Sequence, residues 1–330
     1  MEGLQIDDDE ILQEPNGPSA SGHSAEAQNS SSHVRKLELV QEFGQFEGAW
    51  DVAYNSTDKS LVVCDFRVQP NQVVVFGLDD GDSGLQYVKK FHFDVSSDEE
   101  STPLDVAISA ENKYLIAKCD AGFDVFTADG VFEKTQSIIC MGVKGATSSA
   151  NDEGKNHITS CITTTKDDKI IAGSVIETDN IDATMPTSVV KILNPSGTAE
   201  LQTIPVSLMP VRIATNAHGT RVVVSNVDDD KVCVYDAHSK TETLALEISN
   251  PLGVAYDDQT DCLLIGRMTQ TNPDGDPLDG TGVIEQYCGV TGRLVGILAH
   301  GLYGPTGMTM MDGNKLAVAD MKTVKLYQFK

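Results

Sequence analysis

The feature that most constrains this chain is a repeat of short β-rich segments that ends one segment short. Residues 304–330 hold three such segments, at 308–310, 316–320 and 324–327, separated by polar turns. Short apolar runs bounded by Gly, Asn and Asp predict antiparallel strands. The last strand would leave an open edge, and sheet edges are usually paired or covered. A partner strand from elsewhere in the chain is therefore expected.

The same pattern recurs upstream. Six first strands are expected to begin at residues 49, 103, 159, 210, 251 and 305, and each is followed by a second and a third apolar segment. Five units carry a fourth segment, and residues 36–43, which partly alternate polar and apolar, would supply the sixth. Four-stranded units at spacings of 41 to 56 residues are typical of propeller blades. The sequence predicts an all-β fold: a six-bladed β-propeller over residues 34–330, closed by the N-terminal strand.

Residues 1–33 differ in composition from the rest of the chain. They carry seven acidic residues and no Lys or Arg, and Ser, Gly, Pro and Asn fill much of the remainder. Such a segment cannot bury enough apolar area to offset the entropy that it would lose on ordering. We expect a disordered acidic tail at 1–33.

Charge and cysteine usage narrow the partners and the compartment. The formal net charge is -25, and an acidic protein repels phosphate backbones at long range, so RNA is not the expected partner. The seven cysteines form no Cys-x-x-Cys pair, which favours buried free thiols and a cytoplasmic location. The first residues lack the apolar core of a signal peptide. No apolar run approaches the roughly 18 residues of a membrane span, so no membrane association is expected.

Three of the segments together resemble a known repeat. Residues 251–256 read Pro-Leu-Gly-Val-Ala-Tyr, residues 316–320 read Leu-Ala-Val-Ala-Asp, and residues 324–327 read Val-Lys-Leu-Tyr. This is similar to the NHL repeat, which builds six-bladed propellers, including those that end the tripartite-motif ubiquitin ligases. The Asp that ends the second strand of that repeat is matched by Asp65, Asp120 and Asp320, with Asn226 as a near match. No Asn-His-Arg tripeptide occurs in the chain.

One position, two residues into the first strand, carries a charged side chain in three of the six units. It holds Asp51, Asp105 and Arg212, and it is expected near the mouth of the central channel. Two carboxylates facing a guanidinium could bind a small charged ligand or a cation. Alternatively, each Asp accepts hydrogen bonds from neighbouring backbone N–H groups and Arg212 neutralises the pair, and structural ion pairs are commoner than sites.

The long loop at 267–282 contains a calcium candidate. Asp274, Asp276 and Asp279 lie among glycines in an oxygen-rich segment, and oxygen ligands suit calcium. The spacing departs from the EF-hand pattern, which favours an ordinary surface loop. No other cofactor is expected.

A binding face is expected where the long insertions gather, at residues 140–158, 174–187 and 267–282. The candidate contact residues on this face are Trp50, Arg67, Arg267 and Lys322. Trp50, the only tryptophan, would either fill a gap between blades or project near the channel as a contact anchor. Loops on a rigid scaffold commonly carry binding.

These observations favour a non-enzymatic protein-binding platform, because no catalytic set can be assembled from the sequence motifs. The NHL resemblance implies substrate recognition in ubiquitylation. The chain has no RING-type Cys/His set, so it would serve only as a recognition part. Two alternatives stay open. One is an RNA-binding NHL propeller. The other is a cation-dependent lactonase- or esterase-like hydrolase with a central-channel site, in which Asp51 and Asp105 would be the visible carboxylates.

Overall fold

A computed structural model describes residues 35–66, 71–79, 86–96, 103–118, 122–138, 157–176, 187–207, 209–270 and 280–330. The chain divides into two units, residues 1–32 and 33–330, and all the described residues belong to the second. None of them forms a helix of the length and apolarity that a membrane span requires.

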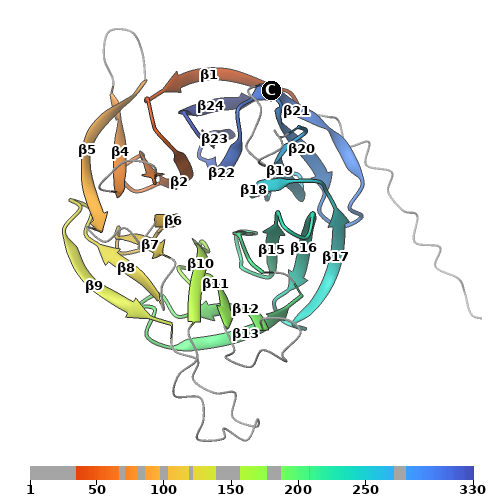
Figure 1. Cartoon of the computed structure of the whole chain (residues 1–330), viewed down its shortest axis with the longest axis horizontal. Coiled ribbons are helices and arrows are strands. Elements are labelled where there is room, and N and C mark those ends of the chain that lie inside the picture. Colours follow the sequence, from red (N-terminus) through yellow and green to blue (C-terminus); the bar gives the residue numbers. More distant parts are fainter. Residues whose placement is uncertain are drawn as a thin grey trace, which may run out of the picture. The chain divides into compact units, whose positions relative to one another are not determined.

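The second unit is an all-β propeller of six four-stranded antiparallel sheets, arranged round a central axis (Figure 1). Each sheet is one blade, and we number the blades 1 to 6 along the chain. One strand of each blade lies nearest the axis. These innermost strands are β2 (Ala49–Asn55), β6 (Pro103–Ile108), β10 (His157–Thr164), β14 (Arg212–Thr215), β18 (Pro251–Asp257) and β22 (Pro305–Met311).

Two middle strands follow in every blade. The second strands are β3 (Ser60–Asp65), β7 (Tyr114–Lys118), β11 (Ile170–Ile176), β15 (Arg221–Asn226), β19 (Cys262–Met268) and β23 (Lys315–Asp320). The third strands are β4 (Asn71–Asp79), β8 (Gly122–Phe126), β12 (Thr187–Leu193), β16 (Lys231–Asp236), β20 (Gly282–Cys288) and β24 (Thr323–Phe329). They are rich in Val, Ile and Leu because blades pack on both of their faces.

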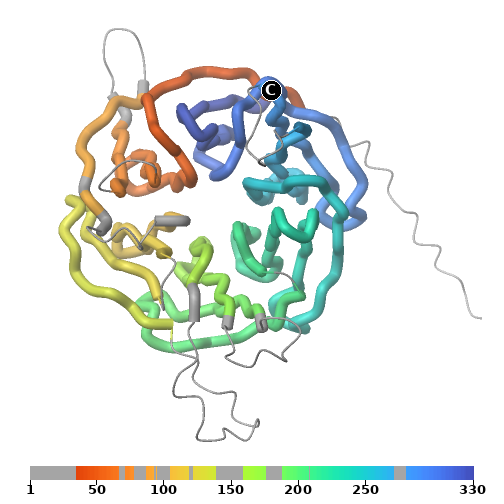
Figure 2. Tube along the Cα trace, viewed as in Figure 1, coloured from red at the N-terminus to blue at the C-terminus, as the bar shows by residue number. Residues whose placement is uncertain are grey.

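The outermost strands confirm the predicted closure of the ring. Five follow directly in sequence: β5 (Gln86–Ser96), β9 (Phe132–Ser137), β13 (Glu200–Val206), β17 (Thr241–Glu247) and β21 (Leu294–Leu302). The sixth, β1 (Leu37–Phe43), comes from the other end of the chain and pairs antiparallel with β24, from Leu37 opposite Phe329 to Phe43 opposite Val324. Figure 2 shows this junction, where the red start of the described chain meets its blue end.

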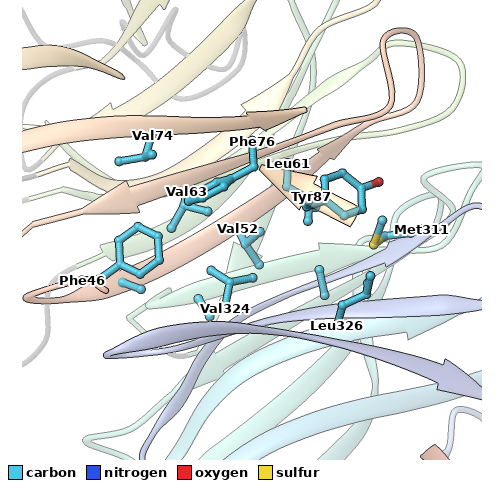
Figure 3. Packing of buried hydrophobic residues seen from close by; sticks show 13 residues of the cluster. Phe46, Val52, Leu61, Val63, Val74, Phe76, Tyr87, Met311, Val324 and Leu326 are labelled. Atoms are coloured by element: carbon cyan, nitrogen blue, oxygen red, sulfur yellow. The ribbon is translucent and has the colours of Figure 1, made fainter. Parts of the chain in front are cut away.

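The core lies between the blades, where each pair of neighbouring sheets encloses a cluster of apolar side chains. Figure 3 shows the cluster at the closure, in which Val63 and Phe76 of blade 1 face Val324 and Leu326 of blade 6. Fully burying one such side chain stabilises the fold by about 1.5–3 kcal/mol. The closure is therefore held by packing as well as by the β1–β24 ladder.

Candidate functional site: the central channel and the loop face

A cavity of about 750 Å³ lies on the propeller axis, lined mainly by the innermost strands. Asp51, Asp105 and Arg212 lie where these strands begin, and the turns that follow the strands, for example at Asp168 and Asp312, line the other end. We call the end of the propeller that carries the second-to-third and the blade-to-blade connections the loop face. The three charged residues lie at the end of the cavity nearest the loop face, and they are only 5, 3 and 4% exposed.

A β-bulge directly precedes each of the two carboxylates. The register of β2 against β3 shifts between Ala49 and Asp51, and that of β6 against β7 shifts between Pro103 and Asp105. A bulge bends a strand and re-aims its side chains. Each Asp reaches the next blade: Asp51 Oδ2 accepts the Val106 N–H at 2.9 Å.

The same link recurs one blade further on. Asp105 Oδ2 accepts the Ile162 N–H of blade 3 at 2.9 Å. The equivalent residue in blade 6 is Gly307, where a Cβ would lie 2.3 Å from Asp51 Oδ1. A larger side chain at 307 would therefore displace the Asp51 carboxylate. Asp51, Asp105 and Gly307 therefore form one packed arrangement on the axis.

Arg212 crosses from blade 4 to the opposite side of the ring. Its Nε donates to the Thr306 carbonyl of blade 6 at 2.9 Å, and its Nη2 donates to the Trp50 carbonyl of blade 1 at 3.1 Å. Nη1 donates to the Val211 carbonyl at 3.0 Å. The guanidinium also lies 4.9 Å from the centre of the Trp50 ring. Arg212 thus ties three blades together at one end of the cavity.

Burial and the neighbouring charge set the protonation of the carboxyl pair. The pKa of Asp105 is raised well above its usual value, first by burial and then by the charge of Asp51 and a hydrogen bond to it, while Arg212 opposes the shift. Protonation of Asp105 relieves the repulsion between the two buried carboxyl groups. Burial also raises the pKa of the neighbouring Cys64 and Cys161 thiols, which makes them poor nucleophiles.

The Asp that ends a second strand fastens the segment entering the innermost strand. Asp65 Oδ1 accepts the Gly48 N–H at 2.9 Å, and Asp320 Oδ1 accepts the Gly304 N–H at 2.7 Å. Asn226, the near match, instead accepts the Asp228 N–H within its own turn. The sequence located these positions but did not show which backbone groups they bind.

The second matched aspartate, Asp120, lies outside the described residues.

Two of the predicted contact residues come together on the loop face. The Trp50 ring meets Phe66 edge-on with centroids 4.8 Å apart, and Lys322 Nζ lies 4.1 Å from the centre of the Tyr303 ring. The two pairs are neighbours, because the Ala49 N–H, one residue before Trp50, donates to the Met321 carbonyl, one residue before Lys322.

We call Trp50, Phe66, Tyr303 and Lys322 the aromatic cluster. Its three aromatic residues are partly exposed and Lys322 is exposed. Sequence reasoning missed Phe66 and Tyr303, although each lies in a connection on this face, directly after β3 and two residues before β22.

Of the other two predicted contact residues, the structure describes only Arg267, which pairs with Glu285 and not with the aromatic cluster. Arg267 is held by Glu285 through two hydrogen bonds, from Nε at 2.9 Å and from Nη2 at 2.8 Å, so its charge is already compensated. Arg67 lies outside the described residues.

The calcium candidates Asp274, Asp276 and Asp279 also lie outside the described residues, so this prediction stands as made. Within the described ranges, no three His, Cys, Asp or Glu side chains are grouped so that they could hold a metal ion. Titration of the protein with CaCl₂ in a calorimeter tests the loop, with Asp276→Asn as the comparison.

No protein-family model matches this sequence, and no curated protein matches it. Solved structures match it by fold. A luciferin-regenerating enzyme aligns with a TM-score of 0.59 at 11% identity, over 89% of this chain and 95% of that one. The WD40 propeller domain of Doa1 aligns with a TM-score of 0.54 at 10% identity, over 89% of this chain and 97% of that one.

A protein of unknown function from Bacteroides caccae aligns with a TM-score of 0.55 at 12% identity, over 79% of this chain and 82% of that one. At these identities the likeness concerns the fold alone. One of these propellers is an enzyme and another is a WD40 domain, so the comparisons leave the function to be argued from the residues of this chain.

Proposed function

We propose that this protein is a non-enzymatic platform that binds a protein partner on its loop face. The observation that carries the proposal is the aromatic cluster at the junction of blades 6 and 1, where Trp50, Phe66 and Tyr303 lie partly exposed beside Lys322. Aromatic side chains dominate binding energies at protein interfaces because they bury a large area at low entropic cost. Trp50 lies in β2, and Phe66 and Tyr303 lie in connections directly beside β3 and β22.

The partner class follows from the resemblance to NHL propellers. By resemblance to the propellers of the tripartite-motif ligases, the bound protein would be a substrate for ubiquitylation, and this chain would recognise that substrate. The reducing environment that its free cysteines favour agrees with a cytoplasmic partner. The same proposal divides the chain into an acidic tail, residues 1–33, and a propeller domain, residues 34–330.

A capture experiment with paired variants tests the platform. The purified full chain is immobilised and exposed to an extract of its source cells, beside a Tyr303→Ala/Lys322→Glu variant and a Lys59→Glu control. Lys59 is exposed on a first-to-second turn, at the opposite end of blade 1. We expect a protein that the wild type and the control retain and that the double variant loses at least tenfold. Equal capture by all three, with circular dichroism showing intact folds, would contradict the proposal.

RNA is a less favoured partner for this propeller than a protein. The net charge of -25 repels phosphate, and Arg267, one of the expected contact cations, is already paired with Glu285. Phosphate tracking needs several clustered cations. We expect filter-binding assays at about 0.15 M salt to give no retention of a mixed-sequence single-stranded RNA. Tight retention that weakens steeply with added salt would favour RNA instead.

The axial cavity favours a second candidate function, the binding of a small ligand. Its volume of about 750 Å³ falls in the range of roughly 300–1,000 Å³ that ligand pockets occupy. In its enzymatic form this candidate is a cation-dependent lactonase- or esterase-like hydrolase acting at Asp51 and Asp105. Both carboxylates already accept backbone N–H groups, which leaves them poorly placed to bind a cation.

The assay for this candidate is hydrolysis of δ-valerolactone with and without CaCl₂. We expect no calcium-dependent rate for the wild type. Calcium-dependent hydrolysis that disappears in Asp51→Asn would establish the enzyme and displace the platform.

A further inference from the structure

Two cysteines face each other on the two middle strands of blade 5, β19 and β20. Cys262 begins β19 and Cys288 ends β20, and the antiparallel register places them directly opposite. Both are free thiols. Residues directly opposite in an antiparallel pair project from the same face of the sheet. Their spacing in the sequence, with 25 residues between them, gives no sign of this arrangement.

The backbone hydrogen bonds show which kind of cross-strand pair this is. Cys288 directs both of its backbone polar groups toward β21: its N–H donates to the Arg293 carbonyl, and its carbonyl accepts the Gly292 N–H, both at 2.9 Å. The bond toward β19 is made one residue later, from the Gly289 N–H to the Asp261 carbonyl at 2.8 Å. Cys262 and Cys288 therefore form a non-hydrogen-bonded pair.

That kind of pair has the spacing that a disulfide needs. In non-hydrogen-bonded pairs the Cα atoms lie about 4.5 Å apart and the side chains are closer than in the other kind. Disulfides span Cα separations of roughly 4.4–6.8 Å. Closing the bond requires rotation of the two side chains and little movement of the backbone.

The surroundings give the two sulfurs different chemistry. Cys288, the last residue of β20, is partly exposed. A hydrogen bond from the Thr291 side chain and backbone N–H groups of Thr291 and Val290 lower the pKa of its thiol. Cys262 is 4% exposed, and burial raises the pKa of its thiol. A partly exposed thiol with a lowered pKa next to a buried thiol with a raised pKa is the arrangement of an attacking and a resolving cysteine.

We propose that Cys262 and Cys288 are a thiol-oxidation site, which a hydroperoxide closes to a cross-strand disulfide. The Cys288 thiolate attacks one oxygen of hydrogen peroxide. An S–O bond forms, the O–O bond breaks, and the departing hydroxide takes a proton to become water. Cys288 is thereby oxidised to a sulfenic acid and the peroxide is reduced.

The Cys262 sulfur then attacks the Cys288 sulfur. An S–S bond forms, the S–O bond breaks, and the leaving hydroxide combines with the Cys262 proton as a second water. One peroxide and two thiols thus give one disulfide and two waters, and a dithiol reductant reverses the change.

The site lies beside the cavity end that the turns line. Cys262 follows directly after the turn at residues 258–261, and the cavity is lined by Gln259 of that turn and by Asp257, the last residue of β18. The Asp261 carbonyl binds Gly289, next to Cys288. A disulfide here would hold this turn to the turn after β20.

Peptide mapping tests the proposal on the full chain. The reduced protein is treated with hydrogen peroxide, alkylated and digested with trypsin without reduction. Trypsin cuts at Arg267, between the two cysteines, and the peptides 241–267 and 268–293 each contain one cysteine. We expect these peptides to appear as one cross-linked species, two hydrogens lighter than their sum, which dithiothreitol separates.

Variants assign the two roles. In Cys262→Ala we expect no cross-link and a Cys288 sulfenic acid that dimedone traps. In Cys288→Ala we expect neither product. Cys233→Ser, at a buried cysteine in blade 4, should behave as the wild type. Failure of the wild type to form the 241–267 to 268–293 cross-link, or linkage of Cys288 chiefly to another cysteine, would overturn the proposal, and neither outcome bears on the platform function.

Discussion

At the residue scale, the axis of this propeller is organised by one arginine and two aspartates. Arg212 binds the carbonyls of Trp50 and Thr306 from across the ring, and Asp51 and Asp105 each bind the backbone of the next blade. These bonds satisfy buried charges that would otherwise be costly. They also explain how three charged residues can be buried together at one end of the cavity.

Replacing Arg212 by Met should destabilise the protein by about 3 kcal/mol. The buried carboxyl pair would lose the neighbouring positive charge, and the hydrogen bonds from Arg212 to the Thr306 and Trp50 carbonyls would be lost. Urea unfolding followed by circular dichroism measures this. The matched control is Arg221→Met, whose ion pair with Asp261 is half exposed and should cost less than about 1 kcal/mol. Equal losses in the two variants would show that Arg212 does not brace the ring.

The raised pKa of Asp105 predicts how the stability of the protein depends on pH. Because burial and Asp51 raise the pKa of Asp105 in the folded state, the folded state binds this proton more tightly than the unfolded state does. The stability gained from the proton is complete below the ordinary pKa of 3.8 and is lost as pH rises toward the folded pKa. Asp105→Asn keeps a neutral side chain and removes this dependence.

We therefore expect Asp105→Asn to gain stability relative to the wild type as pH rises from about 5 to 8. Urea midpoints of both proteins across this range provide the measurement. A difference that stays constant with pH would mean that Asp105 is ionised in the folded protein.

At the element scale, β1 decides whether the ring closes. It covers the free edge of β24 from Val324 to Phe329. It also reaches blade 1, because the Gln41 side chain accepts the Tyr87 N–H and donates to the Tyr87 carbonyl, both at 3.0 Å. Phe43 adds a ring contact with Phe76, with centroids 5.0 Å apart. β1 is therefore both the last strand of blade 6 and a bond between blades 6 and 1.

Truncation on either side of β1 tests this role and the domain boundary together. A chain of residues 34–330 should unfold cooperatively at nearly the melting temperature of the full protein, because residues 1–33 are not expected to belong to the propeller. A chain of residues 44–330 exposes the β24 edge, so it should melt far lower or aggregate. Differential scanning calorimetry with light scattering distinguishes the two. Similar melting of both chains would refute the closure argument.

At the scale of the whole molecule, the net charge of -25 opposes compaction. Several ion pairs, such as Lys59 with Asp312, are exposed, and exposed pairs contribute little. Self-repulsion is therefore the larger surface electrostatic effect. It keeps the protein soluble at a cost in stability.

Added salt should accordingly stabilise this protein. Raising NaCl from about 0.01 to 0.15 M shortens the screening length from roughly 30 to 8 Å, and we expect a rise in melting temperature of a few degrees, for a gain on the order of 1 kcal/mol. Calorimetric scans at each salt concentration measure it. The rise should shrink near the isoelectric pH, where self-repulsion vanishes, and a fall in melting temperature would indicate that ion pairs dominate.

The architecture follows from the sequence alone: the number of blades, four strands in each, and closure by residues 36–43. These follow from local patterns, because apolar runs, turn residues and an unpaired last strand are visible along the chain. Even the boundaries were close, although the strand expected from residue 210 begins at Arg212.

The contacts of the charged residues and of the cysteines, by contrast, depend on the tertiary structure. Arg212 meets Trp50 and Thr306, 162 and 94 residues away, and no local pattern encodes a bond across the ring. Cys262 faces Cys288 because a register places them opposite, and a shift of one residue would separate them. Strand formation depends on neighbours in sequence, whereas these contacts depend on how strands that lie far apart in the sequence are packed.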